Sequence, residues 1–322
     1  MSSHEPFDTY PLMFEPILKF PIWGGKRLYS LKNIPPQDRP LGEIWEISAV
    51  EGNETKVANG ELAGTDLTQL IDRYGEHISG TQVYKRYGKR FPLLIKFIDA
   101  DRDLSVQVHP GDRLAQERHG SPGKDEMWYI INARPESRLL FGFNRKIDRQ
   151  TYLDAVHHGT LPGLLHEEPV AAGDVYYIPA GRAHAIGGGI LLAEIQQSSD
   201  ITYRIYDWNR GRELHTGPAA AAIHYDHPKT FKTHYKSSPG TVNGIVNSPH
   251  FTTEIIDCKE TLHFENDGKS FHILINVSGE AVISGNFENL RLPYLHTTLL
   301  PASLSRYSIS CRHRTKILRV RL

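Results

Sequence analysis

The stretch LSVQVHP, residues 104–110, indicates both the fold and the chemistry of this chain. Successive side chains of a β-strand point to opposite faces. Alternate residues here are aliphatic and are expected to pack in a hydrophobic layer: Leu104, Val106 and Val108. The residues between them are polar and share the other face: Ser105, Gln107 and His109. Gln107 and His109 are therefore spaced to reach one ion from the interior of a barrel.

Strand patterns dominate the chain, as short apolar runs between Gly, Pro, Asn and Asp. They predict strands at residues 91–99, 103–109, 126–132, 174–178, 190–196, 201–206, 251–258, 270–277, 280–283 and 315–320. Helices are predicted at residues 66–74, 112–119 and 148–158, with Thr65 or Asp66 capping the first. Many short strands joined by regular turns are typical of a β-barrel or sandwich.

Length and composition suggest about two domains, since the chain has 322 residues and is 39% hydrophobic. A polar stretch with two prolines occupies residues 227–240. We therefore expect a domain boundary near residue 228. Residues 1–228 would form the catalytic domain, and residues 229–322 a second β-rich domain.

The charge balance does not favour a polyanionic partner such as nucleic acid, because 37 basic residues face 37 acidic ones. Cys258 and Cys311 are too few for a disulfide framework and are expected to be free thiols. No apolar run approaches the roughly 18 residues of a membrane span. The N-terminus has no pattern of a signal peptide. We expect a cytoplasmic protein without a membrane partner.

Two later segments add metal-binding side chains to those of residues 107 and 109. Glu126 begins a predicted return strand, and Lys124 would point to the same face. His184 follows the turn Pro179–Ala180–Gly181, where glycine permits a positive φ. Two imidazoles, a carboxylate and an amide oxygen suit zinc, and also manganese, iron or cobalt. Coordination positions would remain open for water or substrate.

Four blocks of the sequence resemble type I mannose-6-phosphate isomerase in its compact, bacterial form: PLLIKFI (92–98), LSVQVHP (104–110), KDEMW (124–128) and PAGRAH (179–184). The resemblance implies a mainly β protein of two cupin-like jelly-roll domains with a few short helices. It further implies a catalytic zinc and the interconversion of mannose 6-phosphate and fructose 6-phosphate. The metal ligands of that family fall on Gln107, His109, Glu126 and His184.

The remaining expected site residues would bind a sugar phosphate or act on it. Lys96 lies within an apolar strand, where an unpaired ammonium is costly, although an edge strand facing solvent would also accommodate it. The expected substrate contacts are Trp23, Lys96 and Ser105, with a core position as the alternative for Trp23. By resemblance, Arg204 is the expected active-site arginine and Glu194 a candidate acid or base. Lys124 is expected to join Arg204 in stabilising the enediolate, which makes it the third expected catalytic residue. Glu194 is the leading base, ahead of His109 or a metal-bound water.

Two other functions remain open at this point. One is a cupin oxygenase with iron, although such sites usually contain more histidine. The other is a non-catalytic sugar-binding or regulatory protein that keeps the metal. The oligomeric state, the metal bound in the cell, the physiological pathway and the role of the second domain are also open.

Overall fold

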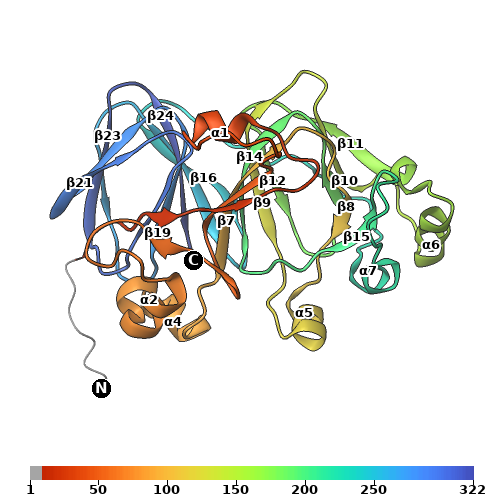
Figure 1. The fold of residues 1–322 in the computed structure, drawn as a ribbon, viewed down its shortest axis with the longest axis horizontal. Helices are drawn as coiled ribbons and strands as arrows, with labels where there is room; N and C mark the ends of the chain where they lie inside the picture. The colour runs from red at the N-terminus through yellow and green to blue at the C-terminus, as the bar shows by residue number, and fades with distance from the viewer. Residues whose placement is uncertain (1–8) are drawn as a thin grey trace.

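The computed structural model describes residues 9–322, a mainly β protein in which two pairs of stacked sheets lie side by side (Figure 1). The first pair belongs to the N-terminal half. The β8 sheet has the order β11 (Leu165–Pro169), β10 (Arg138–Phe143), β13 (His184–Ile186), β8 (Val106–Val108) and β15 (Tyr203–Tyr206). The β7 sheet has the order β12 (Val175–Ile178), β9 (Glu126–Ala133), β14 (Ile190–Gln197), β7 (Leu93–Ala100), β3 (Glu43–Ile47) and β2 (Ile17–Lys19).

The second pair belongs to the C-terminal half, drawn in blue in Figure 1. The β17 sheet has the order β16 (Thr241–Asn247), β17 (Thr252–Cys258), β24 (Thr315–Arg321), β19 (His272–Ser278) and β22 (Thr297–Leu300). The β20 sheet has the order β18 (Leu262–Glu265), β23 (Arg306–Cys311), β20 (Ala281–Gly285) and β21 (Phe287–Leu292). Two small ladders pair β1 (Phe14–Glu15) with β6 (Lys56–Val57), and β4 (Ala49–Val50) with β5 (Asn53–Glu54).

The helices are short and lie around the sheets: α1 (Arg27–Leu31), α2 (Leu67–Tyr74), α3 (Glu76–Ser79), α4 (Thr81–Tyr87), α5 (Asp112–His119), α6 (Arg149–His157), α7 (Thr216–Ala222) and the 3₁₀ turn Leu161–Leu164. Asp66 begins α2 with a capping box, in which its side chain and that of Gln69 each accept a backbone N–H. Asp148 caps α6 through the Thr151 N–H. Within the described residues, none of these helices has the length and apolar character that crossing a membrane requires.

Four hydrophobic clusters separate these layers. The first lies inside the N-terminal barrel, between the β7 and β8 sheets. The second packs the outer face of the β8 sheet against α6 and α7. The third fills the C-terminal sandwich, between the β17 and β20 sheets. The fourth cluster joins the two halves, because it contains side chains from the outer face of the β7 sheet and from the β17 sheet.

All ten predicted strands and all three predicted helices are present, with shifts of at most three residues at their ends. One detail of the opening stretch is wrong. Val106 and Val108 pack under α6 and α7, but Leu104 belongs to the cluster inside the barrel. The reason is that β8 begins only at Val106, so the strand alternation does not extend back to residue 104. The domain boundary at residue 228 stays a prediction; it falls between α7 and β16.

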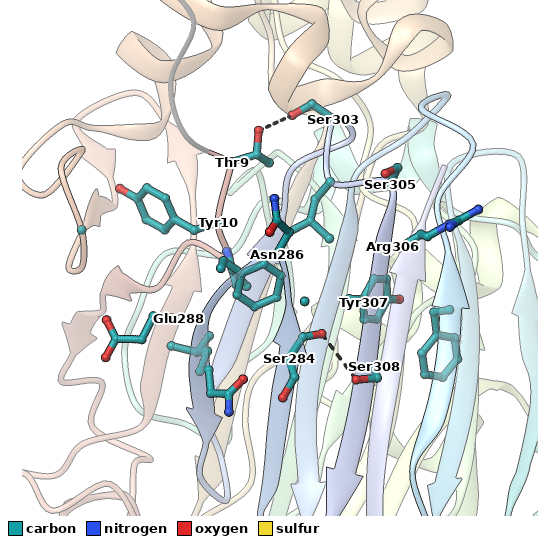
Figure 2. A pocket seen from close by; sticks show the side chains of 18 of the residues that line it. Thr9, Tyr10, Ser284, Asn286, Glu288, Ser303, Ser305, Arg306, Tyr307 and Ser308 are labelled. Atoms are coloured by element: carbon teal, nitrogen blue, oxygen red, sulfur yellow. Dashed lines mark hydrogen bonds between the residues drawn. The ribbon is translucent and has the colours of Figure 1, made fainter.

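A large open cavity of about 1720 Å³ lies in the C-terminal half, as Figure 2 shows. Its walls come from the start of the described chain at Thr9 and Tyr10, from the β20–β21 connection around Asn286, and from the β23 segment around Tyr307. None of the site residues expected from the sequence lines it. The expected site lies instead inside the N-terminal barrel.

Candidate metal centre

The expected ligands lie on facing strands of the N-terminal barrel. In the β8 sheet, Gln107 on β8 is paired across the ladder with His184 on β13 and with Arg204 on β15, so these side chains share one face. In the β7 sheet, Glu126 begins β9 and is paired with Gln196 on β14. Candidate ligands from separate segments thus lie close together, as their spacing predicted, and their role as metal ligands stays a prediction.

The turn before His184 is fixed by a glycine. Gly181 has a φ of +86°, a region that side-chain-bearing residues rarely adopt, as the sequence led us to expect. A Cβ at this position would also lie 2.8 Å from the Ala222 carbonyl oxygen. The Gly181 N–H donates to the His109 carbonyl at 2.8 Å, so the turn holds the two histidine-bearing segments together.

Both histidines turn the same nitrogen toward the centre of the cluster. His109 Nδ1 donates to the Ile201 carbonyl at 2.9 Å, and His184 Nδ1 donates to the Arg182 carbonyl at 2.8 Å. A carbonyl oxygen can only accept, so each Nδ1 must carry the proton and each neutral ring presents the lone pair of Nε2. Such backbone bonds orient metal-binding imidazoles.

Glu126 completes a group of three buried acceptors. Its Oε1 lies 3.2 Å from His184 Nε2, and its Oε2 lies 3.6 Å from His109 Nε2. The ligand atoms of the three residues all lie within 4.8 Å of one another. Glu126 Oε1 is buried and accepts no hydrogen bond. Because a buried acceptor without a donor is costly, this arrangement fits a cation at the centre of the group.

The protonation states also suit a metal. Burial, reinforced by Lys124, holds the pKa of His109 well below its ordinary value. Burial likewise lowers the pKa of His184 to about 3. Both rings are therefore neutral, the form that binds metals. Burial raises the pKa of Glu126 despite the nearby Lys124. A divalent ion would reverse that effect, since it favours the carboxylate form.

Gln107 and Lys124 stand at the edge of the three-residue group. Gln107 Nε2 lies 3.2 Å from His184 Nε2, and turning its amide by 180° would direct the oxygen toward the same centre. Lys124 Nζ lies 2.5 Å from Glu126 Oε2 and 3.0 Å from His109 Nε2. The ammonium is therefore on the same face as the predicted ligands, as strand alternation indicated.

A second buried charge pair lies along the same sheet. Lys96 Nζ is 3.1 Å from Glu194 Oε1, and Trp128 Nε1 donates to Glu194 Oε2 at 2.8 Å. Lys96 also lies 3.7 Å from Glu43 and stacks over the Trp45 ring. Lys96 is on β7, between β14 and β3, so the alternative of a solvent-facing lysine on an edge strand is wrong.

The other expected site residues lie at the border of the barrel interior. Arg204 donates through Nη1 to the Glu213 carbonyl at 3.0 Å, while its buried Nε has no acceptor. Ser105 is buried just before β8. Trp23 is also buried, and it packs in the interior cluster with Trp128. Contacts of Trp23 and Ser105 with a substrate stay predictions.

Sequence reasoning missed a polar cluster at the strand ends around the ligands. Asp125 accepts the Ala180 N–H at 2.9 Å, and its own N–H donates to Gln197 Oε1 at 2.9 Å. Gln197 Nε2 donates to Asp112 Oδ1 at 2.9 Å. Alternation places Asp125 on the face opposite Lys124 and Glu126, with the apolar Met127 and Tyr129, so the segment itself gave no sign of a role near the candidate ligands.

Comparison with known proteins identifies the family. Residues 13–157 match the family model described as phosphomannose isomerase type I, catalytic domain. Mannose-6-phosphate isomerase ManA of Bacillus subtilis is 40% identical over 214 residues, covering 64% of this chain and 66% of that protein. The putative mannose-6-phosphate isomerase YvyI of the same organism is 31% identical over 93% of this chain and 95% of its own length. The chain belongs to the type I phosphomannose isomerase family.

Solved structures extend the likeness to the entire fold. The crystal structure of the mannose 6-phosphate isomerase from Bacillus subtilis covers 98% of this chain and all of its own chain, with a TM-score of 0.87 and 30% identity. A putative mannosephosphate isomerase from Archaeoglobus fulgidus, at 21% identity, has a TM-score of 0.81 and shares the fold. The cupin-type architecture expected from the sequence is thereby confirmed.

Proposed function

We propose that this phosphomannose isomerase family member interconverts mannose 6-phosphate and fructose 6-phosphate, using one divalent metal held by Gln107, His109, Glu126 and His184. The observation that carries the proposal is the meeting of three buried acceptors, one of them an unpaired carboxylate oxygen. Zinc is the proposed metal because a mixed nitrogen and oxygen donor set with open positions is typical of catalytic zinc.

The reaction moves a proton between C2 and C1 of the open-chain sugar through an enediol. A bound zinc ion would supply a Lewis acid that polarises the oxygen atoms at that end of the substrate. Arg204 and Lys124 are the proposed cations for the negative charge that develops on the enediolate. Both reach the barrel interior, and both retain nitrogen atoms that can donate to an oxyanion.

Glu194 is the proposed base. Burial alone would raise its pKa, but Lys96 and Lys124 outweigh burial and lower it. Glu194 is therefore ionised at neutral pH and able to accept a proton. Its pairing with Lys96 reduces its basicity, however. We propose that Lys96 and Ser105 bind the substrate phosphate, which would draw the ammonium away from Glu194 and raise the basicity of the carboxylate when substrate is present.

A coupled assay that follows fructose 6-phosphate formation tests the proposal. The purified protein should convert mannose 6-phosphate, lose activity on chelation of its metal, and recover it when zinc is restored. Full activity after complete metal removal would refute the metal-dependent mechanism. A metal-loaded protein without turnover would refute the isomerase activity and favour a binding function.

A further inference from the structure

Three polar side chains outside the ligand set connect the strand ends that carry it: Asp112, Asp125 and Gln197, here called the Asp125 cluster. Gln197 and Asp125 exchange two hydrogen bonds. The Asp125 N–H donates to Gln197 Oε1 at 2.9 Å, and the Gln197 N–H donates to the Asp125 carbonyl at 3.1 Å. Gln197 Nε2 then donates to Asp112 Oδ1. The cluster thus joins the end of β14 to the segments before β9 and at the start of α5.

The Asp125 carboxylate extends this connection to the turn that precedes His184. Its Oδ1 accepts the Ala180 N–H at 2.9 Å, and its Oδ2 accepts the hydroxyl of Tyr177. On the other side, Asp112 Oδ1 accepts the Gly123 N–H at 2.8 Å. The cluster therefore binds the backbone beside His109, Glu126 and His184 and makes no hydrogen bond to the candidate ligand atoms themselves.

Two members of the cluster are shielded from water, whereas the Asp112 side chain is 58% exposed. Gln197 is 5% exposed, and the Asp125 side chain is 13% exposed. Hydrogen bonds to a carboxylate shielded from water are stronger and more directional than exposed ones. Groups around a metal site that orient its ligands typically change metal affinity or activity by about 10–100-fold when removed.

A loop of the C-terminal half reaches the same cluster. His250, in the connection between β16 and β17, places Nε2 at 3.8 Å from Asp125 Oδ2 and 4.0 Å from Asp112 Oδ2. The neighbouring Phe251 ring packs edge-on against Tyr177 at 6.4 Å between centroids. Arg86 Nη1 donates to the Pro249 carbonyl at 3.0 Å, which fixes the loop.

We propose that Asp125 and Gln197 are positioning residues that hold the segments of His109, Glu126 and His184 in metal-binding geometry, and that His250 makes the C-terminal half part of this support. The inference rests on the metal site of the proposed function. It gives the C-terminal half a role in the site although that half contributes no ligand.

The test compares Asp125→Ala with Asp174→Ala, because the two aspartates are closely matched. Asp174 precedes β12 as Asp125 precedes β9, and its side chain is 16% exposed. It accepts a backbone N–H from Ala171 at 2.9 Å and a hydroxyl from Tyr176 at 3.4 Å, at the other end of the β9–β12 pair. The readouts are zinc affinity against a chromophoric chelator, the visible spectrum of the Co²⁺-loaded protein, and the thermal unfolding midpoint.

Asp125→Ala and Gln197→Ala should weaken zinc binding about 10-fold or more and alter the Co²⁺ spectrum. Asp125→Asn should recover most of the affinity, because its amide oxygen still accepts from Ala180. Asp174→Ala should lower only the unfolding midpoint. His250→Ala should weaken zinc binding less than Asp125→Ala does.

Equal zinc affinity and Co²⁺ spectra in Asp125→Ala and Asp174→Ala would overturn the proposal, whatever their stabilities. If His250→Ala bound zinc as tightly as the wild type, the proposal that the C-terminal half supports the metal site would be wrong. These readouts do not require turnover. A wild-type protein that binds zinc but forms no fructose 6-phosphate would refute the isomerase activity alone, and the affinity comparison would still decide the positioning role.

Discussion

Lys96 and Glu194 occupy directly opposite positions on the neighbouring strands β7 and β14, and their charged atoms lie 3.1 Å apart inside the barrel. The glutamate is further held by Trp128, which donates to its second oxygen. Taking two charges out of water is costly, and only close pairing with additional hydrogen bonds offsets that cost. A buried ion pair of this kind is uncommon, and the proposed role of Glu194 as the base would account for it.

Removing the lysine should change the pH dependence of turnover. Lys96 lowers the pKa of Glu194, so Lys96→Met should raise that pKa and move the acidic limb of the kcat/KM profile toward neutral pH. A shift of about one pH unit or more is expected if Glu194 is the base. Lys19→Met is the control, because Lys19 also stacks on Trp45 but the ammonium paired with Glu194 is that of Lys96. Superimposable acidic limbs in Lys96→Met and wild type would exclude Glu194 as the group that titrates.

Substitutions of two buried glutamates in the barrel should affect metal binding and proton transfer separately. Glu126→Gln removes a proposed ligand and should lower zinc affinity by more than about 100-fold, beyond the usual effect of an outer partner. Glu194→Gln should retain stoichiometric zinc but lower kcat by about 100-fold or more, the range for loss of a general base. Elemental analysis of the purified variants and the coupled assay measure the two effects. The assignment is wrong if Glu194→Gln loses its zinc or Glu126→Gln keeps it.

The place of the candidate ligands could be predicted in part because several of them are polar residues that interrupt apolar strands with period two. Gln107 on β8 and His109 just after it follow that pattern, and Glu126 begins a strand whose next residues are buried. Each such polar residue can therefore be recognised from the few residues around it in the sequence. Helix α5 was predicted with its observed bounds because Pro110 and Gly111 end the preceding strand just before it.

The supporting contacts could not be predicted because they depend on tertiary packing. Asp125 points away from the ligand face, and its partners Gln197 and His250 lie 72 and 125 positions further along the chain (197 − 125 and 250 − 125). A local sequence pattern contains no information about contacts between residues so far apart in the chain. Helices α3 and α4 were missed for a different reason: at four and seven residues they span too few turns for a helical period to be visible.

The hydrophobic cluster shared by the two halves should contribute a large part of the free energy of unfolding. Phe271 is fully buried in the shared cluster, with its ring 4.8 Å from that of Phe91. Phe271→Ala should lower the free energy of unfolding by about 3–5 kcal/mol. All four tryptophans precede residue 228, so their fluorescence in urea reports on the N-terminal half. We expect that signal to shift to lower urea although the substitution lies in the C-terminal half.

Val242→Ala on β16 is the matched control for this experiment, because Val242 is 36% exposed. Its effect should stay within about 0.5 kcal/mol. An unchanged fluorescence transition in Phe271→Ala, with a shift only in the circular dichroism signal, would mean that the halves unfold independently.

His272 should make the protein less stable as the pH falls below neutrality. It is buried on β19, where its Nδ1 lies 2.9 Å from the Tyr307 hydroxyl. Burial, helped by Arg319 and Arg321, lowers its pKa from 6.5 to about 3. Between those values the unfolded chain binds a proton that the folded protein does not. Stability therefore falls as the pH drops through this window, by up to about 1.4 kcal/mol per unit.

His272→Gln keeps a hydrogen-bonding side chain but removes the titration. Between pH 7 and pH 5 the wild type should lose about 2 kcal/mol more stability than this variant, the linkage expected for one such histidine. Urea unfolding at a series of pH values, followed by circular dichroism, measures the difference. His263→Gln, at an exposed position of β18 in the facing β20 sheet, should follow the wild-type curve. Parallel pH curves for wild type and His272→Gln would show that His272 gains its proton in the folded protein as readily as in the unfolded chain.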